Sequence, residues 1–435
     1  MNRKLGFILS LFILLFFLPY VRFSRVEVEA SHDYLVHNIV TGLNYPTIQE
    51  AIDAPETLSG HTIFVEEGTY YENVVLSKPN LTLIGENKHT TIIDGNGKSI
   101  AVSLTANNTR IEGFTVQNGS CGIQIYPWTS GHIICNNVIS NNDYGISGHY
   151  DCVNISICDN IITSNNAAGI EMLFSHSVVG NNLISDNGKG EFQGFGSGVH
   201  IVRGINSHVF YCVNNTVFGN TIKNHKIGIW AIRYSEANLF FHNNFVNNTE
   251  QISASAAIWN NSAKENYWSN YNGTDANKDG IGDIPYRIGD IIQDERPLMG
   301  VFYDFNTSLG YHVNVISNST VEDFEYFESN STIKMHVSNM TTSQTYGFCR
   351  ICIPHALMNE TYHVTIDGAE PYYVNYALYD NGTHRWIYFS YKHSTLEIVI
   401  VQEFLSLITL PLFMIATLLA VIAYRRNILH NRMQT

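Results

Sequence analysis

One phrase recurs with variations between Asn107 and Ile258, and no other feature constrains the fold of this chain as strongly. Each copy has a pair of polar residues, a short apolar alternation, an Asn-rich bend and then Gly-Ile. One asparagine in each copy serves as its marker, and these markers are Asn137, Asn160, Asn182, Asn220 and Asn244. Successive markers are separated by 23, 22, 38 and 24 residues. Three of the four intervals share one length, and the fourth contains an insertion. A repeat of this kind predicts a solenoid.

The content of each copy identifies the type of solenoid. A period near 23 is too short for a two-helix repeat, and runs such as Val138-Ile139 and Ile161-Ile162 are β-branched and bounded by Asn and Gly. Short runs of this type between tight bends are typical of strands. The sequence therefore predicts an all-β fold in which residues 31–300 form a right-handed parallel β-helix.

Coils of a β-helix stack about 4.8 Å apart, so equivalent positions form columns. Asparagine amides in such a column can hydrogen-bond to one another, and asparagine tolerates left-handed backbone at a bend. This structural role explains the repeated asparagines without a ligand. Cys135 and Cys158 share one column, which indicates a thiol ladder or an interior pair on neighbouring coils.

The amino-terminal segment and the composition indicate an extracytoplasmic protein. Arg3 and Lys4 precede an apolar run from Leu5 to Leu18, as in a signal peptide, and we assign residues 1–30 to one; a retained signal anchor is the alternative. Fourteen Asn-x-Ser/Thr sequons fit this location. A formal charge of −14 with only 14% charged residues argues against nucleic acid as a partner.

A short helix is expected before the first coils. Thr47 and Glu50 have capping-box spacing, and Ile48, Ala51 and Ile52 form an apolar stripe. Such a helix would cover the open end of the solenoid, whose interior and strand edges otherwise face water.

The stretch from Tyr45 to Gly95 resembles the amino-terminal part of pectin-esterase-like and NosD-like β-helix proteins, and the resemblance continues through the repeats. The segment from Asn266 to Asp275 and on to Tyr286 is similar to the closing motif of the NosD type. The resemblance implies a surface or periplasmic β-helix of the class that contains carbohydrate-binding proteins and sugar hydrolases. The resemblance also implies a relation to copper, because the protein after which the family is named carries a copper-related description.

The segment 275–283 has the pattern of a calcium loop. Oxygen side chains occupy positions 1, 3, 5 and 9, a glycine occupies position 6, and position 7 offers a backbone carbonyl. The ligands expected for Ca²⁺ are Asp275, Asn277, Asp279, Ile281 and Asp283. Position 12 is Tyr286, so Asp290 or Asp294 would have to replace the usual bidentate carboxylate. The alternative is an unliganded Asx-turn loop, and either way the role is structural.

Two columns near the Gly-Ile positions are candidates for ligand binding. Strand alternation turns one column outward on successive coils: Gln124, Ser147, Glu171, His200 and Trp230. Two residues further along lie Tyr126, His149, Leu173, Val202 and Ile232, with Trp128, Asp151, Arg203 and Arg233 at the edge. Aromatic faces cover sugar C–H surfaces and polar groups bind hydroxyls, so an extended glycan suits this strip. We expect the ligand-binding residues to be Gln124, Tyr126, His149, Glu171, His200 and Trp230.

Three other readings of these residues remain open. The strip can be an ordinary outer sheet face. Glu171 and His200 can be an acid–base pair of a polysaccharide lyase, hydrolase or epimerase, although a glycosidase needs a second carboxylate and Asp151 is a distant one. Copper binding is implied by the family name, but the sequence contains no His-x-His, Met-x-x-Met or repeated Cys-x-x-Cys cluster that would supply the ligands.

The carboxyl-terminal part has a different organisation. Residues 301–402 contain alternating runs without the coil period, with Asp367-Gly368 and Asn381-Gly382 between them, which predicts a small antiparallel β-sandwich. The uncharged apolar run from Phe404 to Tyr424 is followed at once by Arg425-Arg426. This predicts a transmembrane anchor over residues 403–425 and a cytoplasmic tail of residues 426–435. The tail resembles the anchors of archaeal surface proteins. The chain is thus expected to be a membrane-anchored surface protein that binds carbohydrate or another surface polymer; a structural envelope component is a further alternative.

Overall fold

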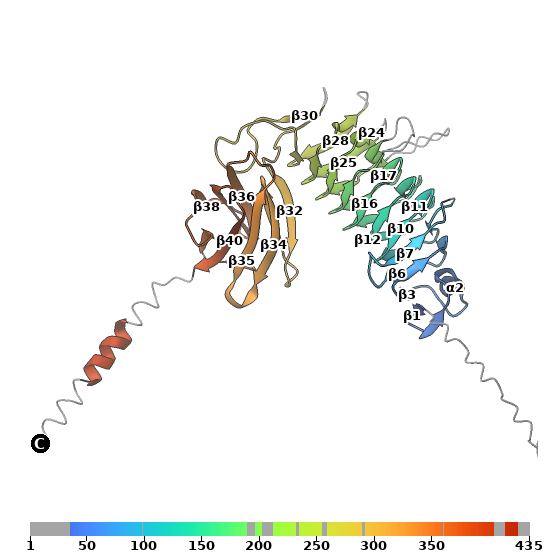
Figure 1. Ribbon diagram of the computed structural model, residues 1–435, viewed down its shortest axis with the longest axis horizontal. Coiled ribbons are helices and arrows are strands. Elements are labelled where there is room, and N and C mark those ends of the chain that lie inside the picture. Colours follow the sequence, from blue (N-terminus) through green and yellow to red (C-terminus); the bar gives the residue numbers. More distant parts are fainter. Residues whose placement is uncertain are drawn as a thin grey trace, which may run out of the picture. The chain divides into compact units, whose positions relative to one another are not determined.

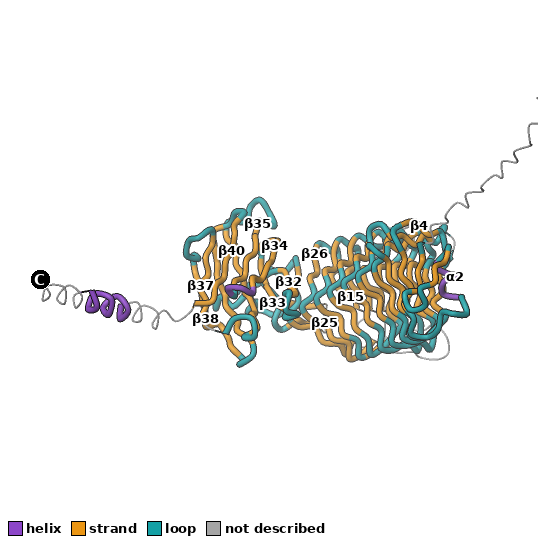
Figure 2. Tube along the Cα trace, turned by 90° about the horizontal axis from the view of Figure 1, so that it is seen from below, coloured by secondary structure: helices purple, strands orange, loops and turns teal. Residues whose placement is uncertain are grey.

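The computed structural model describes residues 35–403, apart from 98, 189–195, 202–211, 232–234, 255–258, 289–291 and 360, together with residues 414–424. The predicted signal peptide lies outside the described residues. From Thr62 to Trp268 the strands form three sheets of a parallel β-helix, as the repeat predicts (Figure 1). The two strands before them, within Val36–Tyr45, join the first sheet in antiparallel pairing. In Figure 2 the coils appear as successive rungs along the stack.

The three sheets have the following strands. The first sheet contains β1 (Val36–Asn38), β2 (Leu43–Tyr45), β3 (Thr62–Val65), β6 (Thr82–Gly85), β9 (Arg110–Glu112), β12 (Ile133–Cys135), β15 (Ser156–Cys158), β18 (Val178–Gly180), β21 (Cys212–Val213), β22 (Thr216–Phe218), β25 (Ser235–Phe241) and β28 (Trp259–Lys264). The second contains β4 (Gly68–Tyr70), β7 (Thr91–Asp94), β10 (Thr115–Gln117), β13 (Val138–Ser140), β16 (Ile161–Thr163), β19 (Leu183–Ser185), β23 (Thr221–Lys223), β26 (Asn244–Val246) and β29 (Tyr267–Trp268). The third contains β5 (Val74–Leu76), β8 (Val102–Leu104), β11 (Cys121–Ile125), β14 (Tyr144–Ser147), β17 (Ala168–Met172), β20 (Ser197–Ile201), β24 (Ile227–Ala231) and β27 (Glu250–Ala254).

The interior of the solenoid is a column of aliphatic side chains in register. Ile139, Ile162 and Ile184 pair across β13, β16 and β19, and all three are fully buried. Burial of a side chain of this size stabilises the fold by about 1.5–3 kcal/mol. Each coil thus adds its own aliphatic layer to one continuous core.

The asparagine column forms a hydrogen-bonded ladder inside the bend between the first two sheets. Each Nδ2 donates to the Oδ1 of the asparagine on the next coil at 2.9–3.2 Å, and the ladder runs through Asn137, Asn160, Asn182, Asn220, Asn243 and Asn266. The structure corrects the marker of the fifth coil, which is Asn243 and not Asn244. Left-handed backbone belongs to the residue before each ladder asparagine, for example Asn136 and Asp159. The two roles assigned to one asparagine are therefore divided between neighbours.

A buried carboxylate ends this ladder. Asp294 accepts hydrogen bonds from the backbone N–H and side-chain Nδ2 of Asn266, at 2.9 and 3.2 Å, and from Nε1 of Trp268 at 3.1 Å. The last asparagine needs a partner that only accepts, and an ionised carboxylate is one. The prediction that Asp294 could complete the calcium loop is therefore wrong, because both of its oxygens are used here.

The glycine column marks places where two backbones approach closely. A Cβ added to Gly145 would lie 2.4 Å from the carbonyl oxygen of Gly169 and 2.9 Å from Nδ2 of Asn165. Asn165 belongs to a second asparagine ladder with Asn142 and Asn187. The column is therefore glycine because the backbone carbonyl of the next coil and this ladder together fill the space of a side chain.

The predicted helix α2 (Ile48–Asp53) covers the first coils. The Thr47 side chain accepts a hydrogen bond from the backbone N–H of Glu50, and Ile48, Ala51 and Ile52 are buried. The helix contacts β1, β2, β3 and β5. The spacing of its cap and of its apolar stripe is thus confirmed.

The carboxyl-terminal part contains a small hairpin, two antiparallel sheets and one 3₁₀ turn. The hairpin pairs β30 (Tyr286–Ile288) with β31 (Ile292–Asp294). The five-stranded sheet contains β32 (Val301–Asn306), β33 (His312–Ser317), β36 (Tyr346–Pro354), β38 (Tyr373–Asp380) and β39 (His384–Lys392). The four-stranded sheet contains β34 (Ser319–Phe327), β35 (Thr332–Asn339), β37 (Thr361–Ile366) and β40 (Leu396–Glu403), and η1 spans Glu328–Asn330.

The two antiparallel sheets share one apolar core, to which Val315 and Phe389 of one sheet and Met335 and Ile400 of the other contribute. The Asn381-Gly382 turn joins the paired strands β38 and β39 and makes a hairpin. Asp367-Gly368 makes a tight turn with positive φ at both residues, but the strand that precedes it, β37, pairs with β40. An Asp-Gly pair between alternating runs predicts a hairpin, but this turn closes only on the antiparallel bridge between Ile366 and Ala369 and does not join two paired strands.

Residues 414–424 are helical. Within the described part of the chain, no helix combines the length and the apolar character that crossing a bilayer requires. Residues 404–413 and 425 of the predicted span, and the whole of the predicted cytoplasmic tail, lie outside the described residues.

Candidate functional site

The outward column of the third sheet is assembled as predicted. In the parallel register, Gln124 pairs with Ser147, Ser147 with Glu171, Glu171 with His200, and His200 with Trp230. Residues more than one hundred positions apart in the sequence thus form one row across five coils. The Gln124 Nε2 donates to the carbonyl oxygen of Ser147 at 3.0 Å, which ties the first two rungs together.

Glu171 occupies the middle of this row. The Ser147 hydroxyl donates to its Oε2 at 2.6 Å, and the side chain is 20% exposed. Burial raises the pKa of Glu171, and the hydrogen bond from Ser147 opposes that shift. Such a carboxyl group retains its proton to a higher pH than a free one, as a general acid does.

His200 is buried, which corrects the prediction of an open outward strip. The imidazole ring of His200 stacks on the ring of Trp230, with the two centroids 4.7 Å apart and an interplanar angle of 14°. The indole therefore covers the imidazole. The His200 side chain is 1% exposed, and its Nδ1 is 4.0 Å from Oε1 of Glu171. Burial lowers the pKa of His200 to about 4, so the ring is neutral at pH 7. Strand alternation correctly assigns His200 to the outer face of the sheet. The stacked ring of Trp230 covers it there and removes it from solvent.

Exposed aromatic rings flank the row at the ends of β11 and β14. Tyr126 is 38% exposed and Trp128 70%. The ring of Trp128 meets that of Tyr150 edge-on at 5.6 Å, and Tyr150 contacts His149 at 4.3 Å. Burial lowers the pKa of His149. Trp128 has a φ of 60°, a left-handed conformation that costs about 1–2 kcal/mol for such a residue. This edge therefore displays a strained, exposed indole beside two further aromatic rings.

The second predicted column is described only in part. Tyr126, His149 and Leu173 lie one residue or two beyond β11, β14 and β17, whereas Val202, Ile232 and the two edge arginines fall outside the described residues. Long insertions in two coils, 189–197 and 205–216, could form walls beside this strip, and most of their residues also lie outside the described part of the chain.

The candidate calcium loop is held by Asx turns. The Asp275 carboxylate accepts hydrogen bonds from the backbone N–H groups of Asp279 and Gly280 at 2.9 and 2.8 Å. Burial raises the pKa of Asp275, as do the charges of Asp279 and Asp283. Within the described part of the chain, the carboxylates of Asp275, Asp279 and Asp283 do not bring one oxygen each to within 4.8 Å of the other two.

The same loop makes contacts with the two-sheet module that the sequence did not suggest. The carbonyl oxygen of Asp279 accepts a hydrogen bond from Nη1 of Arg350 at 2.8 Å, and the ammonium of Lys278 lies 4.4 Å from the ring centroid of Tyr373. Ile281 belongs to an apolar cluster with Phe348. The loop therefore packs against the five-stranded sheet through a hydrogen bond, a cation–π contact and an apolar contact.

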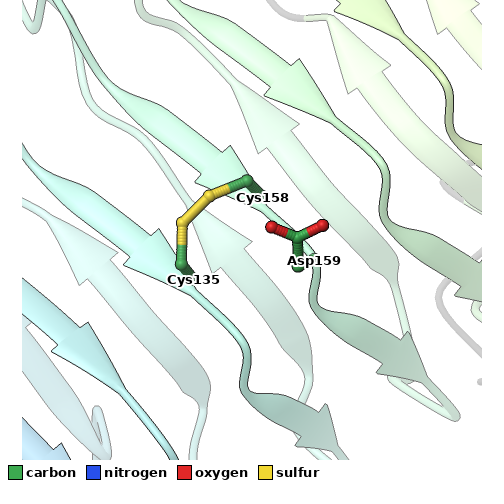
Figure 3. Close-up of side chains that lie close together, drawn as sticks. All are labelled: Cys135, Cys158 and Asp159. Carbon is green, nitrogen blue, oxygen red and sulfur yellow. A yellow bond between two sulfur atoms is a disulfide. The ribbon is translucent and has the colours of Figure 1, made fainter. Parts of the chain in front are cut away.

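Cys135 and Cys158 form a disulfide between adjacent strands, with Cα atoms 4.7 Å apart (Figure 3). Ile134 and Ile157 occupy the interior, so alternation places the disulfide on the outer side of the first sheet. The prediction of a pair on neighbouring coils is confirmed, and its interior placement is wrong. Asp159 lies close enough to both sulfur atoms to complete a group of three metal-ligand residues.

Comparison with known proteins identifies relatives. A family model described as "Periplasmic copper-binding protein (NosD)" matches residues 56–273, which are 218 of the 435 residues. A cell surface glycoprotein of Methanothermus fervidus is 38% identical over 107 residues, which are 24% of this chain and 17% of that protein. A probable ABC transporter binding protein NosD of Stutzerimonas stutzeri is 32% identical over 119 residues, 27% of each chain. The chain thus spans about a quarter or less of the length of these curated relatives.

Solved structures with related architecture include a pectin methylesterase from Yersinia enterocolitica and an alginate lyase from a Paenibacillus strain. The first is 12% identical, with a TM-score of 0.36, over 50% of this chain and 90% of that one. The second is 14% identical, with a TM-score of 0.35, over 51% and 73%.

The family description names copper, and the donors of this chain can be compared with that requirement. Copper sites use convergent thiolate, thioether or imidazole ligands. Among the described residues, the group of three that converges within 4.8 Å is Cys135, Cys158 and Asp159, and its two sulfur atoms are joined to each other. A disulfide offers no thiolate, so this group does not fit a copper site in its oxidised form.

Proposed function

The chain belongs to the NosD family, and from this premise we propose that it is a surface protein whose β-helix binds an extended glycan along the outer face of the third sheet. The observation that carries the proposal is the row of Gln124, Ser147, Glu171, His200 and Trp230 on successive coils. Beside the row lie exposed rings, among them that of Trp128. The rungs repeat at the strand spacing, which suits a ligand that is itself a repeating chain.

The chemistry of the face supports a sugar polymer. Indole and phenol rings can pack on the C–H faces of pyranose rings, while the amide and carboxyl groups of the row exchange hydrogen bonds with hydroxyls. The strained backbone of Trp128 is consistent with a ring held for contact with a ligand. The similarity to a cell surface glycoprotein and the sequons support a surface location, with the apolar segment near the carboxyl end as the anchor.

Binding by purified full chain to an array of polysaccharides tests this function. We expect Trp128→Ala and Trp230→Ala to weaken binding of the captured glycan by about 5- to 30-fold each, which corresponds to about 1–2 kcal/mol. Tyr372→Ala is the matched control, because Tyr372 is 67% exposed and lies outside the β-helix. Unchanged binding in both tryptophan variants, with the fold retained, would contradict the proposal.

A lyase or epimerase acting on uronic-acid polymers is the second candidate. Its basis is the pair of Glu171 and His200, in which burial favours a protonated carboxyl group and a neutral imidazole 4.0 Å apart. For the imidazole to reach a substrate, the ring of Trp230 would have to turn away from it. Release of product from polyuronides that disappears in Glu171→Gln would favour catalysis over recognition alone.

We also propose that the 275–283 loop takes one Ca²⁺ through Asp275, Asn277, Asp279, Ile281 and Asp283. Burial raises the pKa of Asp275, the charges of Asp279 and Asp283 raise it further, and a bound cation would offset that repulsion. Asp294 is occupied in the ladder, so affinity is expected to be weak, with a dissociation constant of about 0.1–1 mM.

A further inference from the structure

A cavity of about 500 Å³ lies between the last coils of the solenoid and the five-stranded sheet. The charged and aromatic residues of its lining include His242, Glu265, Asp279, Arg296, Arg350, Tyr379 and Trp386. Cavities of about 300–1,000 Å³ are the usual size for small-molecule sites. This cavity is separate from the glycan-binding face of the third sheet.

The charges around the cavity are unequally compensated. The Glu265 carboxylate contacts Nε of Arg296 at 2.8 Å and Nε2 of His242 at 3.2 Å, and these partners contribute to a pKa of about 2 for Glu265. Arg350, in contrast, donates one hydrogen bond, to the carbonyl oxygen of Asp279. Within the described part of the chain, no carboxylate oxygen lies within 4.0 Å of its guanidinium.

The Arg350 guanidinium is also poorly solvated. Its Nε atom is buried and has no hydrogen-bond acceptor among the described residues. Burial lowers the pKa of Arg350, although the group remains a cation at any physiological pH. The charges of Asp279 and Glu265 favour the Arg350 cation at longer range without a direct ion pair. A guanidinium also offers paired N–H donors that match a carboxylate. The buried Nε donor of Arg350 therefore suits an anion with two oxygen atoms side by side.

Aromatic rings complete the site. The rings of Tyr379 and Trp386 both line the cavity, with their centroids 5.1 Å apart and their planes inclined at 45°. Two inclined rings beside one guanidinium can hold a ring-shaped ligand by its face and its acid group at once.

We propose that this cavity binds a carboxylate-bearing ligand of the size of one sugar residue, with its carboxylate on Arg350 and its ring against Trp386 and Tyr379. A uronic acid at the end of a glycan has this chemistry, and so does a free cyclic or small organic acid. The proposal does not depend on glycan binding by the third sheet, because no residue is shared.

The test titrates the full chain with galacturonic acid, its uncharged methyl ester and acetate, followed by calorimetry and by tryptophan fluorescence, since Trp386 lies in the wall. We expect galacturonate to bind at least tenfold more tightly than the ester. Acetate weaker than galacturonate would support the ring contact, and acetate of equal affinity would overturn it, because acetate has no ring to pack on Trp386 and Tyr379. Equal binding of galacturonate and its ester, or no saturable binding of any of them, would overturn the proposal.

Variants add an independent check. Arg350→Gln should reduce galacturonate affinity at least tenfold and bring it to the level of the ester, whereas the exposed Arg287→Gln should leave it unchanged. If Arg350→Gln does not fold, the comparison of acid and ester on the unchanged protein still decides the question. A folded Arg350→Gln protein that binds galacturonate as well as the original chain would refute the contact.

Discussion

Replacement of Asp294 by alanine should open the last coil of the solenoid, because this carboxylate ends the asparagine ladder. In the variant, the backbone N–H of Asn266 and the indole N–H of Trp268, both buried, lose their acceptor. A buried donor left unsatisfied costs about 1–3 kcal/mol, so the two together predict a loss of about 4 kcal/mol in local stability. At about 1.4 kcal/mol per factor of ten, the protection of the Asn266 amide should fall about 10³-fold.

Native-state hydrogen exchange measures this loss at the coil where it arises. Asp294→Asn should give a smaller loss, about 2 kcal/mol, because one acceptor oxygen remains while the new NH₂ group faces other donors. Glu295→Ala is the control, since this neighbouring carboxylate is exposed and its side chain contacts Gln293. Less than a tenfold change in Asn266 protection in Asp294→Ala would refute the idea that the ladder needs a terminating acceptor.

Three further predictions concern the sheet face, the glycine column and the calcium loop. The pKa of Glu171 is higher in the folded protein than in the unfolded chain, so the folded state loses stability as the pH rises above the pKa of the unfolded chain. Glu171→Gln removes this titration and should therefore raise the melting temperature at pH 7 and leave it unchanged near pH 4. Gly145→Ala places a Cβ 2.4 Å from the Gly169 oxygen and should cost about 2–3 kcal/mol in urea unfolding, against about 1 kcal/mol for Gly310→Ala, which has open space and only an unfavourable φ. Calorimetry should detect Ca²⁺ binding that Asp275→Asn abolishes, and no heat in the original chain would dismiss the site.

The repeat was sufficient to predict the coil architecture, because a parallel solenoid aligns residues one period apart. The error at Asn244 shows where that reasoning was ambiguous. Two asparagines stand side by side in this coil, and the step of 23 residues from Asn220 to Asn243, and again from Asn243 to Asn266, identifies the correct one. This signal was present in the sequence. Asn244 instead exchanges hydrogen bonds with the backbone of Phe302.

Other features could not be derived from local patterns. Alternation assigned His200 to the outer face, but whether that face stays open depends on the orientation of the Trp230 ring one coil away. Asp294 acts on Asn266 from 28 residues further along the chain, and its place in the ladder follows from the return of the β31 hairpin. Arg350 belongs to no motif, and its cavity exists only because two parts of the chain meet there.

The most direct measurement of the central claim is hydroxyl-radical footprinting of the full chain with and without a polysaccharide that it captures on the array. The account predicts that Tyr126, Trp128 and Tyr150 lose reactivity when the polymer is bound, while Tyr372 keeps its own. Captured polymer that leaves these three rings fully reactive would contradict recognition along the third sheet.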